Sequence, residues 1–570
     1  IHTVTWGEYA KRVERIAAGL AALGVGHGDT VGIMLANRPE FHLVDTAALH
    51  LGAVPFSIYN TSSPDQIAYL FGNAQNRVVI TQQAFLGAVQ AADTPVEHVV
   101  CVDGPATGAM TLADVEANPK ADFDFAASWQ AVEPSDLATL IYTSGTTGPP
   151  KGVELTHRNL LAEAVALHPV FDADYDDRIT SYLPAAHIAD RASAHGLNLI
   201  TGMQITSVAD PREIAAALPD ARPTIFFGVP RVWQKIKAGI EAKLAAEESG
   251  VKKNLANWAL GVAKDYAHRK ANGQGIPIQL QVQYRVADTL VLSKVRHALG
   301  FDKIKIAACG AAATPIEVLE FFLGLGIEIN EVWGMSETTG ASTTTLPGQF
   351  ALGTVGKAVD GVELRLAADG ELLVRGPVIM RGYRGMPEKT AETFDADGWL
   401  ATGDIAKIDA EGYVTIVDRK KELIINEGGK NMSPTNIENA MKAASSLIGQ
   451  AVAIGDNRRY IAALIVLDPD AAAVRAKALG VPEADMAALV ARSEIREEVA
   501  QAVKQGNTKL SKVEQIKRFV IVPQAWDPGG DELTPTMKLR RKPIADKYAD
   551  EIGALYADPA GDGVIDLGTR

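Results

Sequence analysis

Residues 142–152 combine three kinds of group that can hold an anion. Four Ser and Thr hydroxyls, three glycines and Lys151 lie within eleven residues, at the end of an apolar run. Glycines let backbone N–H groups approach an anion, hydroxyls donate hydrogen bonds and the lysine neutralises charge, so the segment predicts a polyphosphate site. It is not a Walker sequence, because Lys151 is followed by Gly152 and not by Ser or Thr. The residues expected to contact the phosphates are Thr143, Ser144, Gly145, Thr146, Thr147, Gly148 and Lys151.

Three further segments carry charged side chains that could take part in chemistry. Glu337 lies within residues 333–340, which begin with Trp333. Asp404 ends the run 397–404. Lys538 lies in the basic segment 534–540. Some of these residues, taken singly, also fit a structural role: Asp404 could be a turn residue, Lys538 a solvated charge and Trp333 a core aromatic.

The elements around these segments alternate between short apolar strands and helices. A helix is expected after Thr5, whose spacing to Glu8 is that of a capping box and which precedes apolar residues at intervals of three and four. Strands are expected at 31–35, 78–81, 137–143, 224–227, 304–308 and 326–332. Strands that alternate with helices favour parallel sheets with helices on both faces. Residues 231–299, rich in Ala, Lys and Glu, predict a helical insert.

The pattern changes after about residue 353. Strands expected at 362–366 and 372–375 flank Asp369-Gly370, a hairpin signal, and further strands are expected at 413–417, 451–455, 460–467 and 519–522. We therefore expect an α/β protein with a large N-terminal domain (1–418) and a small α+β C-terminal domain (419–570). The large domain is expected to hold doubly wound sheets, the helical insert (about 231–300) and a β subdomain (about 353–418).

Composition narrows the class of protein. The chain has 570 residues and a net charge of −14, so it lacks the basic footprint of a general nucleic-acid binder. Its two cysteines fit a reducing, cytoplasmic compartment, and no charge-free apolar run is long enough to span a membrane. Because the chain does not begin with Met, it is expected to start inside the natural protein. A homodimer and contact with a membrane surface are left open by the sequence.

The segments named above resemble, in order, the signatures of the adenylate-forming superfamily, which includes acyl-CoA synthetases, luciferases and peptide-synthetase adenylation domains. The resemblance implies ATP and Mg²⁺: Trp333 would stack on adenine, Glu337 and Thr143 would hold the metal, and Asp404 with Arg419 would grip the ribose. It further implies that Lys538 contacts both the attacking carboxylate and the α-phosphate. Residues 310–312 are similar to a loop near the adenine, although Ala311 stands where the family more often has glycine. Further nucleotide contacts implied by the resemblance are Gly310, Ala311, Ala312, Glu331, Gly334, Met335, Ser336 and Thr338.

Within the superfamily, the chain resembles the fatty-acid–CoA ligases of the long-chain type. Residues 182–191 are similar to the acyl-site motif of that branch and include His187, residues 227–233 resemble another of its segments, and the helical insert is typical of it. Gly428 and Lys430 lie in a segment that resembles the loop lining the pantetheine channel, which implies coenzyme A as co-substrate. Residues 405–409 lack a tryptophan that many fatty-acid enzymes have there, so the chain length of the acid stays open between medium and long.

The implied reaction has two steps: a carboxylate attacks the α-phosphorus of ATP to give acyl-AMP and pyrophosphate, and the thiol of coenzyme A then displaces AMP. The family pattern implies that the small domain rotates about residues 418–421 between the steps, which withdraws Lys538 and brings in Gly428. Cys309 is interpreted as structural. Two alternatives remain: an acyl-AMP ligase that delivers the acyl group to a carrier-protein thiol, and a nucleotide-binding protein without catalytic activity.

Overall fold

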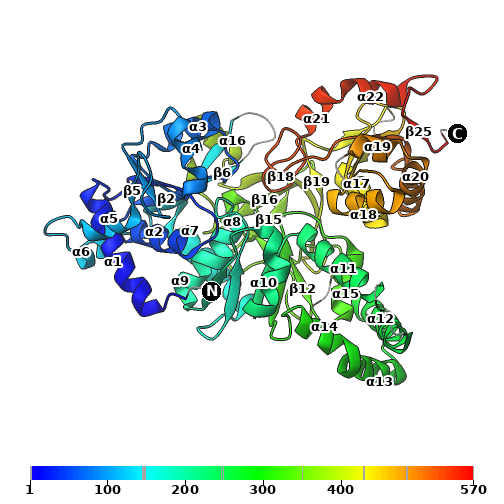
Figure 1. Cartoon of the computed structure of the whole chain (residues 1–570), viewed down its shortest axis with the longest axis horizontal. Coiled ribbons are helices and arrows are strands. Elements are labelled where there is room, and N and C mark those ends of the chain that lie inside the picture. Colours follow the sequence, from blue (N-terminus) through cyan, green and yellow to red (C-terminus); the bar gives the residue numbers. More distant parts are fainter. Residues whose placement is uncertain are drawn as a thin grey trace.

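The computed structural model describes residues 3–143, 149–245, 247, 250–349, 351–427, 430–482 and 485–568. No helix among these residues is long and apolar enough to cross a membrane. Figure 1 shows the first sheet at one end of the molecule, the small domain at the other and a helical projection below.

The first sheet is entirely parallel and buried on both faces. Its order is β2-β1-β3-β4-β5, and it is covered by helices, among them α1, which begins at the expected capping box of Thr5 and Glu8. Its strands are β1 (Thr30–Met34), β2 (Val54–Ser57), β3 (Val78–Thr81), β4 (His98–Cys101) and β5 (Met110–Thr111). The helices of this part are α1 (Trp6–Ala22), α2 (Pro39–His50), α3 (Pro64–Ala74), α4 (Gln83–Ala91), α5 (Leu112–Ala117) and α6 (Phe125–Gln130).

The second sheet has a parallel centre and an antiparallel edge, in the order β14-β13-β12-β11-β10-β8-β9. Its strands are β8 (Arg178–Ser181), β9 (Gln204–Ser207), β10 (Ile225–Gly228), β11 (Ile306–Gly310), β12 (Ile329–Trp333), β13 (Thr343–Thr344) and β14 (Lys357–Ala358). Its helices are α7 (His157–Phe171), α8 (Ile188–Asp190), the π-helix η1 (Arg191–Gly196), α9 (Leu197–Thr201), η2 (Pro211–Glu213), α10 (Ile214–Ala221), α15 (Ile316–Gly324) and the 3₁₀ turn η4 (Ser336–Thr338).

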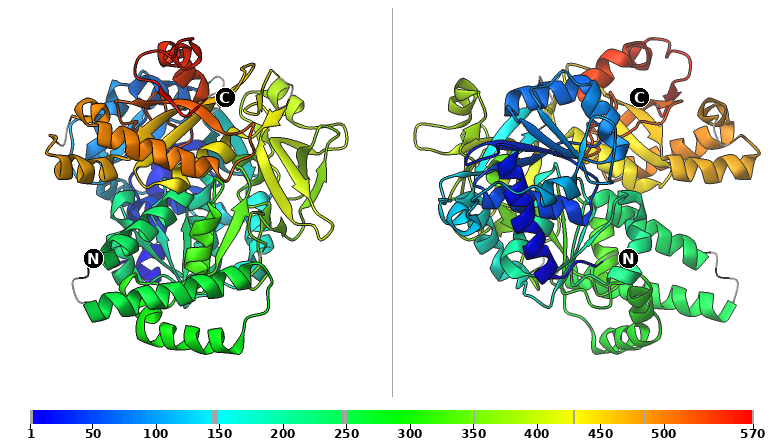
Figure 2. Two further views of the ribbon diagram at one scale, coloured as in Figure 1. Left: turned by 90° about the vertical axis from the view of Figure 1, so that its right-hand side faces the viewer. Right: turned by 60° about the vertical axis from the view of Figure 1, so that its left-hand side comes forward.

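The stretch between β10 and β11 is helical. It forms α11 (Pro230–Ala245), α12 (Gly250–Ala271), α13 (Ile278–Ala287), the π-helix η3 (Asp288–Leu292) and α14 (Ser293–Ala298). In both views of Figure 2, α12 and α13 (green) lie at the lower edge of the molecule.

One expected strand belongs to a different kind of sheet. The run 137–143 does not enter a parallel sheet: β6 (Leu137–Thr143) pairs antiparallel with β7 (Lys151–Thr156), and β17 (Gly382–Tyr383) pairs with the other edge of β7. The helix that follows in the chain, α7, therefore begins only after β7. The candidate phosphate segment thus connects two strands of a hairpin.

The β subdomain and the small domain follow. The expected hairpin at Asp369-Gly370 is confirmed, because Leu366 pairs with Leu372. The subdomain contains β15 (Glu363–Leu366), β16 (Glu371–Arg375), β18 (Leu400–Ile408), β19 (Val414–Arg419) and α16 (Pro387–Thr393). The small domain contains β20 (Ile424–Ile425), β21 (Asn431–Met432), α17 (Pro434–Ala444), β22 (Ile448–Ile454), β23 (Ile461–Leu467), α18 (Pro469–Leu479), α19 (Met486–Ala491), α20 (Ser493–Asn507), β24 (Ile516–Val522), α21 (Arg541–Lys547), α22 (Ala549–Tyr556) and β25 (Ile565–Asp566). Its mixed sheet, β22-β23-β24-β25, has its own apolar core.

Candidate active site

The site forms where the end of β12, the β subdomain and the loop between β24 and α21 of the small domain meet. At its centre is Asp404 on β18, which is 4% exposed. Its Oδ2 accepts a hydrogen bond from the indole N–H of Trp333 at 2.9 Å, and its Oδ1 pairs with Nε of Arg419 at 2.8 Å. Burial raises the pKa of Asp404, while Arg419 and Trp333 oppose that shift. The indole thus anchors the carboxylate; stacking of Trp333 on adenine stays a prediction.

Glu337 lies in the loop that follows β12 and is buried. Its Oε1 accepts a hydrogen bond from the hydroxyl of Tyr383 at 2.8 Å, and burial together with Glu337 raises the pKa of that tyrosine. The ammonium of Lys151 lies 4.0 Å from the centre of the Tyr383 ring. Tyr383 was not predicted from the sequence; the signal available was an aromatic residue between two glycines, at 382–385.

The loop that carries Glu337 is fixed by close backbone packing. A side chain at Gly334 would place its Cβ 1.6 Å from the carbonyl oxygen of Gly340. Met335, Ser336 and Thr338 shape the turn itself, since the hydroxyl of Thr338 accepts from the backbone N–H of Met335 at 3.1 Å. Gly334, Met335, Ser336 and Thr338 therefore belong to one closely packed turn, and their contacts with the nucleotide stay predictions.

A second buried carboxyl, missed in the sequence, supports this loop from α7. Glu163 is 3% exposed, and its Oε1 accepts from the backbone N–H of Ala341. Burial raises the pKa of Glu163 to about 8, so the group is protonated at neutral pH. Its other oxygen is buried without a hydrogen-bond partner among the described residues.

Lys538 reaches this cluster from the small domain. It ends a tight turn in which its backbone N–H donates to the hydroxyl of Thr534 at 3.0 Å. Its side chain keeps contact with solvent, yet the protein around it and the charge of Arg419 lower its pKa, while Asp404 and Glu337 favour the charged form. The loop between β24 and α21 therefore places an ammonium within electrostatic range of both acidic residues.

His187 lies near Lys538, at the start of α8. Its Nδ1 accepts from the backbone N–H of Ala189 at 3.1 Å, so the ring proton of the neutral imidazole belongs on Nε2. Burial and the charge of Lys538 lower the pKa of His187 to about 3. The segment is held by buried Asp190, whose carboxylate accepts from the backbone N–H groups of Tyr182 and Leu183 at 3.2 Å.

The adenine-loop residues lie at the end of β11. Gly310 ends the strand, and Ala311 has φ 70°, the left-handed region that glycine adopts without strain. The departure from glycine at Ala311 therefore places an alanine in a backbone conformation that glycine adopts more easily. Ala312 is exposed.

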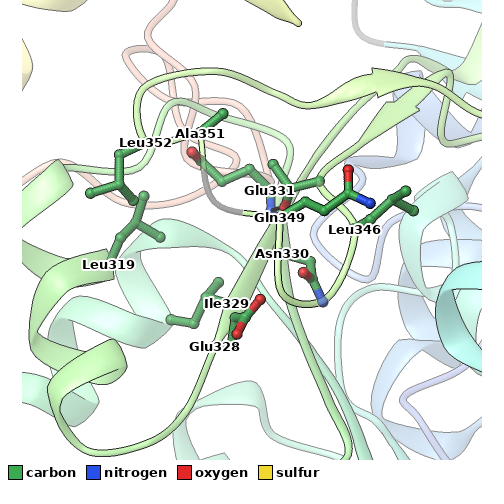
Figure 3. A pocket seen from close by; sticks show the side chains of 10 residues that line it. Leu319, Glu328, Ile329, Asn330, Glu331, Leu346, Gln349, Ala351 and Leu352 are labelled. Atoms are coloured by element: carbon green, nitrogen blue, oxygen red, sulfur yellow. Dashed lines mark hydrogen bonds between the residues drawn. The ribbon is translucent and has the colours of Figure 1, made fainter. Parts of the chain in front are cut away.

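Glu331 lies on β12, behind this loop. Burial raises the pKa of Glu331 to about 8, and a hydrogen bond with Thr314 opposes the shift. Figure 3 shows it in a small pocket between Leu319 and Leu352 on one side and Gln349 on the other. The cavity volume of about 10 Å³ leaves room for about one water molecule, so this pocket does not accommodate an acyl chain.

The remaining predicted residues are placed as follows. Thr143 ends β6, with its hydroxyl 3.4 Å from the carbonyl oxygen of Lys151. Lys430 is exposed beside the β20–β21 pair, and its backbone N–H donates to Asn426. The other predicted contacts lie outside the described residues: Ser144, Gly145, Thr146, Thr147, Gly148 and Gly428.

The chemistry of the donors fits Mg²⁺ bound largely through substrate. The described residues contain no cluster of three or more His, Cys, Asp or Glu that could hold a metal by itself. One carboxylate, Glu337, and one hydroxyl, Thr143, are the hard oxygen ligands expected where phosphates and water complete the coordination.

Residues 418–421, the expected hinge, contact both sides of the expected domain boundary. Asp418 is buried, and its carboxylate accepts hydrogen bonds from Ser433 and Thr435 at the start of α17. Lys420 instead pairs with Asp369 and Glu371 of the β subdomain, at 2.5 and 2.8 Å. Two residues of this short segment, Asp418 and Lys420, are therefore bound to opposite sides of the expected boundary.

Ion pairs also cross between the helical insert and the small domain. Lys235 on α11 pairs with Asp470 at 2.7 Å, and Arg231 lies 3.5 Å from Asp468. Both contacts join residues of α11 to residues at the start of α18.

Fold and site together define an α/β enzyme in which Lys538 of the small domain lies near the Trp333–Asp404–Arg419 cluster of the large domain. The family model for the AMP-binding enzyme matches residues 1–384, and that for the AMP-binding enzyme C-terminal domain matches residues 421–560. The chain belongs to the family of AMP-binding enzymes.

Curated relatives and solved structures agree. The chain is 52% identical to a putative fatty-acid–CoA ligase, fadD11, of Mycobacterium tuberculosis, over 79% of each chain. It is 36% identical to the long-chain-fatty-acid–CoA ligase FadD15 of Mycobacterium bovis, over 97% of this chain and 92% of that protein. ATP-bound MatB from Rhodopseudomonas palustris has the same fold, with a TM-score of 0.69 and 22% identity over 96% of this chain and 94% of that one.

Proposed function

We propose that the protein is an ATP-dependent fatty-acyl-CoA synthetase, which activates a medium- to long-chain fatty acid as acyl-AMP and transfers the acyl group to coenzyme A. The observation that carries the proposal is the meeting of Lys538, from the small domain, with the Trp333–Asp404–Arg419 cluster and Glu337 of the large domain. The relatives named fatty-acid–CoA ligases support the choice of acid and of thiol.

In the first step an oxygen of the carboxylate bonds to the α-phosphorus of ATP, and the bond to the bridging oxygen breaks with its electron pair leaving on pyrophosphate. Two anions must meet, so the residues act chiefly by positioning and by neutralising charge. Lys538 is suited to lie between the carboxylate and the α-phosphate, and Lys151 to balance the departing phosphates. When bound, Mg²⁺ would supply further neutralisation beside Glu337.

The ribose is the natural partner of Asp404. Trp333 and Arg419 each occupy one lone pair of a different carboxylate oxygen, and each oxygen retains acceptor capacity for a sugar hydroxyl. Trp333 and Arg419 thus fix the orientation of the Asp404 carboxylate before the nucleotide binds.

His187 contributes a hydrogen-bond donor rather than a base. With Nδ1 occupied by a backbone N–H and a pKa of about 3, the imidazole stays neutral at physiological pH and can offer its Nε2–H to a carboxylate or phosphate oxygen. Its role is to orient an anion beside Lys538.

In the second step the coenzyme A thiol loses its proton, attacks the acyl carbonyl and releases AMP with the electron pair of the broken C–O bond. We propose that the small domain rotates about residues 418–421 for this step, which removes Lys538 and brings Gly428 and Lys430 to the channel. The contacts of Lys235 and Arg231 with the small domain would have to break. The Lys235–Asp470 pair is exposed and therefore of small energy, and Arg231 lies 3.5 Å from Asp468.

The proposal is tested with a panel of carboxylic acids from short to very long, scored for AMP release with and without coenzyme A. We expect acid-dependent release that coenzyme A strongly accelerates, with a maximum at medium or long chains. Release that responds to an acyl carrier protein and not to coenzyme A would instead identify an acyl-AMP ligase, and the absence of turnover with every acid would refute catalysis.

A further inference from the structure

The helical insert presents an apolar face that nothing in the described chain covers. Helix α12 packs on α15, with Ala259 and Ala263 buried. Helix α13 packs in turn on α12, where the rings of Tyr284 and Tyr266 stack at 4.0 Å, and the Tyr284 hydroxyl donates to the carbonyl oxygen of Gly324 at 3.1 Å. These contacts fix which side of α13 points inward.

The outward side of α13 is unusually apolar. Ile278, Val282 and Val286, spaced by four residues, are 80%, 53% and 44% exposed, and Leu290 in the following η3 turn is 42% exposed. Residues four apart lie on one face of a helix, so these side chains form a stripe. Single exposed apolar side chains are ordinary, whereas a continuous stripe indicates an interaction surface.

The same helices are basic in an acidic protein. Residues 250–298 contain eight Lys or Arg against two Asp, a net charge of +6, whereas the whole chain has −14. Arg285 lies between Val282 and Val286 in sequence and is exposed like them. The positive charge is therefore concentrated on the part of the molecule that projects farthest from the body (Figures 1 and 2).

We infer that the outer face of the insert, defined by Ile278, Val282, Arg285, Val286 and Leu290, docks on an anionic lipid bilayer. An apolar helical stripe with flanking cations matches the interface of such a bilayer, where side chains enter the headgroup region and cations meet anionic headgroups. A symmetric dimer through this face would set two regions of charge +6 against each other, because the same patch meets itself across a two-fold axis.

The role of the insert in reaching the substrate rests on the proposed function. A fatty acid partitions into a bilayer, so an enzyme docked there meets its substrate at high local concentration. Helix α11 connects the insert to the site: Trp233 is packed in the core of the second sheet, and Arg231 reaches the small domain.

The experiment is flotation of the full chain with vesicles, without acid or ATP, so that it is independent of turnover. Vesicles of phosphatidylcholine alone are compared with vesicles of phosphatidylcholine and phosphatidylglycerol. We expect binding to the anionic vesicles, lost at 1 M salt, where the Debye length is about 3 Å. Val282→Gln with Val286→Gln should lower the partition coefficient about tenfold, and Arg285→Glu with Lys294→Glu should do the same.

The matched control is Val474→Gln on α18, a side chain that is 66% exposed on the small domain; it should bind vesicles as the unmodified chain does. Circular dichroism and AMP release with a short, water-soluble acid show whether each variant is folded. Equal binding to neutral and anionic vesicles, no binding by the unmodified chain, or unchanged binding by both folded double variants would overturn the inference. A concentration-dependent dimer that the glutamine pair abolishes, without vesicle binding, would assign the face to self-association. Failure of the proposed function would appear separately, as no turnover with any acid.

Discussion

Asp404→Asn offers the sharpest view of how the site recognises ATP. Each oxygen of the carboxylate already has one partner: the Trp333 indole at 2.9 Å for one and Arg419 at 2.8 Å for the other. The residue is 4% exposed. An asparagine of the same shape has only one acceptor oxygen. The NH₂ group of the asparagine must therefore face either the Trp333 indole N–H or the Arg419 guanidinium. That donor then meets a second donor instead of an acceptor inside a buried cluster.

The expected loss follows from the contacts. A hydrogen bond to a charged group contributes about 1.5–3 kcal/mol, so losing one such bond to ribose and weakening the other costs about 3 kcal/mol. That corresponds to a decrease of about two orders of magnitude in kcat/KM for ATP. The free energy of unfolding should fall less, by about 1–2 kcal/mol, because Arg419 is 45% exposed and its pair is screened.

The assay is acid-dependent ATP–pyrophosphate exchange with ATP and with its 2′-deoxy and 3′-deoxy analogues. The unmodified enzyme should discriminate strongly against both analogues, and Asp404→Asn should discriminate little. Asp397→Asn, in the same segment and exposed, is the control that should behave as the unmodified chain. If the unmodified enzyme uses all three nucleotides equally well, the assignment of Asp404 to the ribose is refuted.

Substitutions at three further positions test other parts of the site. Glu337→Gln should raise the Mg²⁺ concentration for half-maximal exchange about tenfold at an unchanged Tm, because the amide oxygen still accepts from Tyr383; a lower Tm with unaltered Mg²⁺ dependence would contradict this. Lys538→Ala should lower exchange about a hundredfold but spare thioester formation from supplied acyl-adenylate, and equal loss in both steps would make Lys538 structural. Because the pKa of Lys538 is lowered, exchange by the unmodified enzyme should decline with rising pH, and the midpoint of that decline should lie below the usual lysine pKa of about 10.4. Lys538→Arg should move the midpoint to higher pH. Gly334→Ala should abolish exchange, since its Cβ would lie 1.6 Å from a carbonyl oxygen; retained activity would show that the loop relaxes.

Local signals in the sequence predicted much of the fold. The capping box at Thr5 and the turn at Asp369-Gly370 involve residues adjacent in the chain, and both are confirmed. Strand β6 was placed in the wrong kind of sheet, because an apolar run has the same appearance in a hairpin and in a parallel sheet. Only its pairing with β7 decides, and apolar periodicity says nothing about partners.

Several residues that the structure brings together could be named from the sequence, but their contacts could not. Trp333, Asp404 and Lys538 were named from motifs, yet the hydrogen bond that joins Trp333 to Asp404 spans 71 residues and depends on two sheets meeting. Tyr383 and Glu163 were missed for the same reason: each touches the loop of Glu337 from an element distant in sequence.

The central claim is that the carboxylate of the acid attacks the α-phosphorus of ATP. It is tested most directly with a fatty acid labelled with ¹⁸O in both carboxylate positions, turned over with ATP and coenzyme A, followed by mass spectrometry of the products. One labelled oxygen bridges acyl group and phosphorus in the adenylate and leaves with AMP, so we predict AMP that carries one ¹⁸O and pyrophosphate that carries none. Label in inorganic phosphate together with ADP, or unlabelled AMP, would contradict the account.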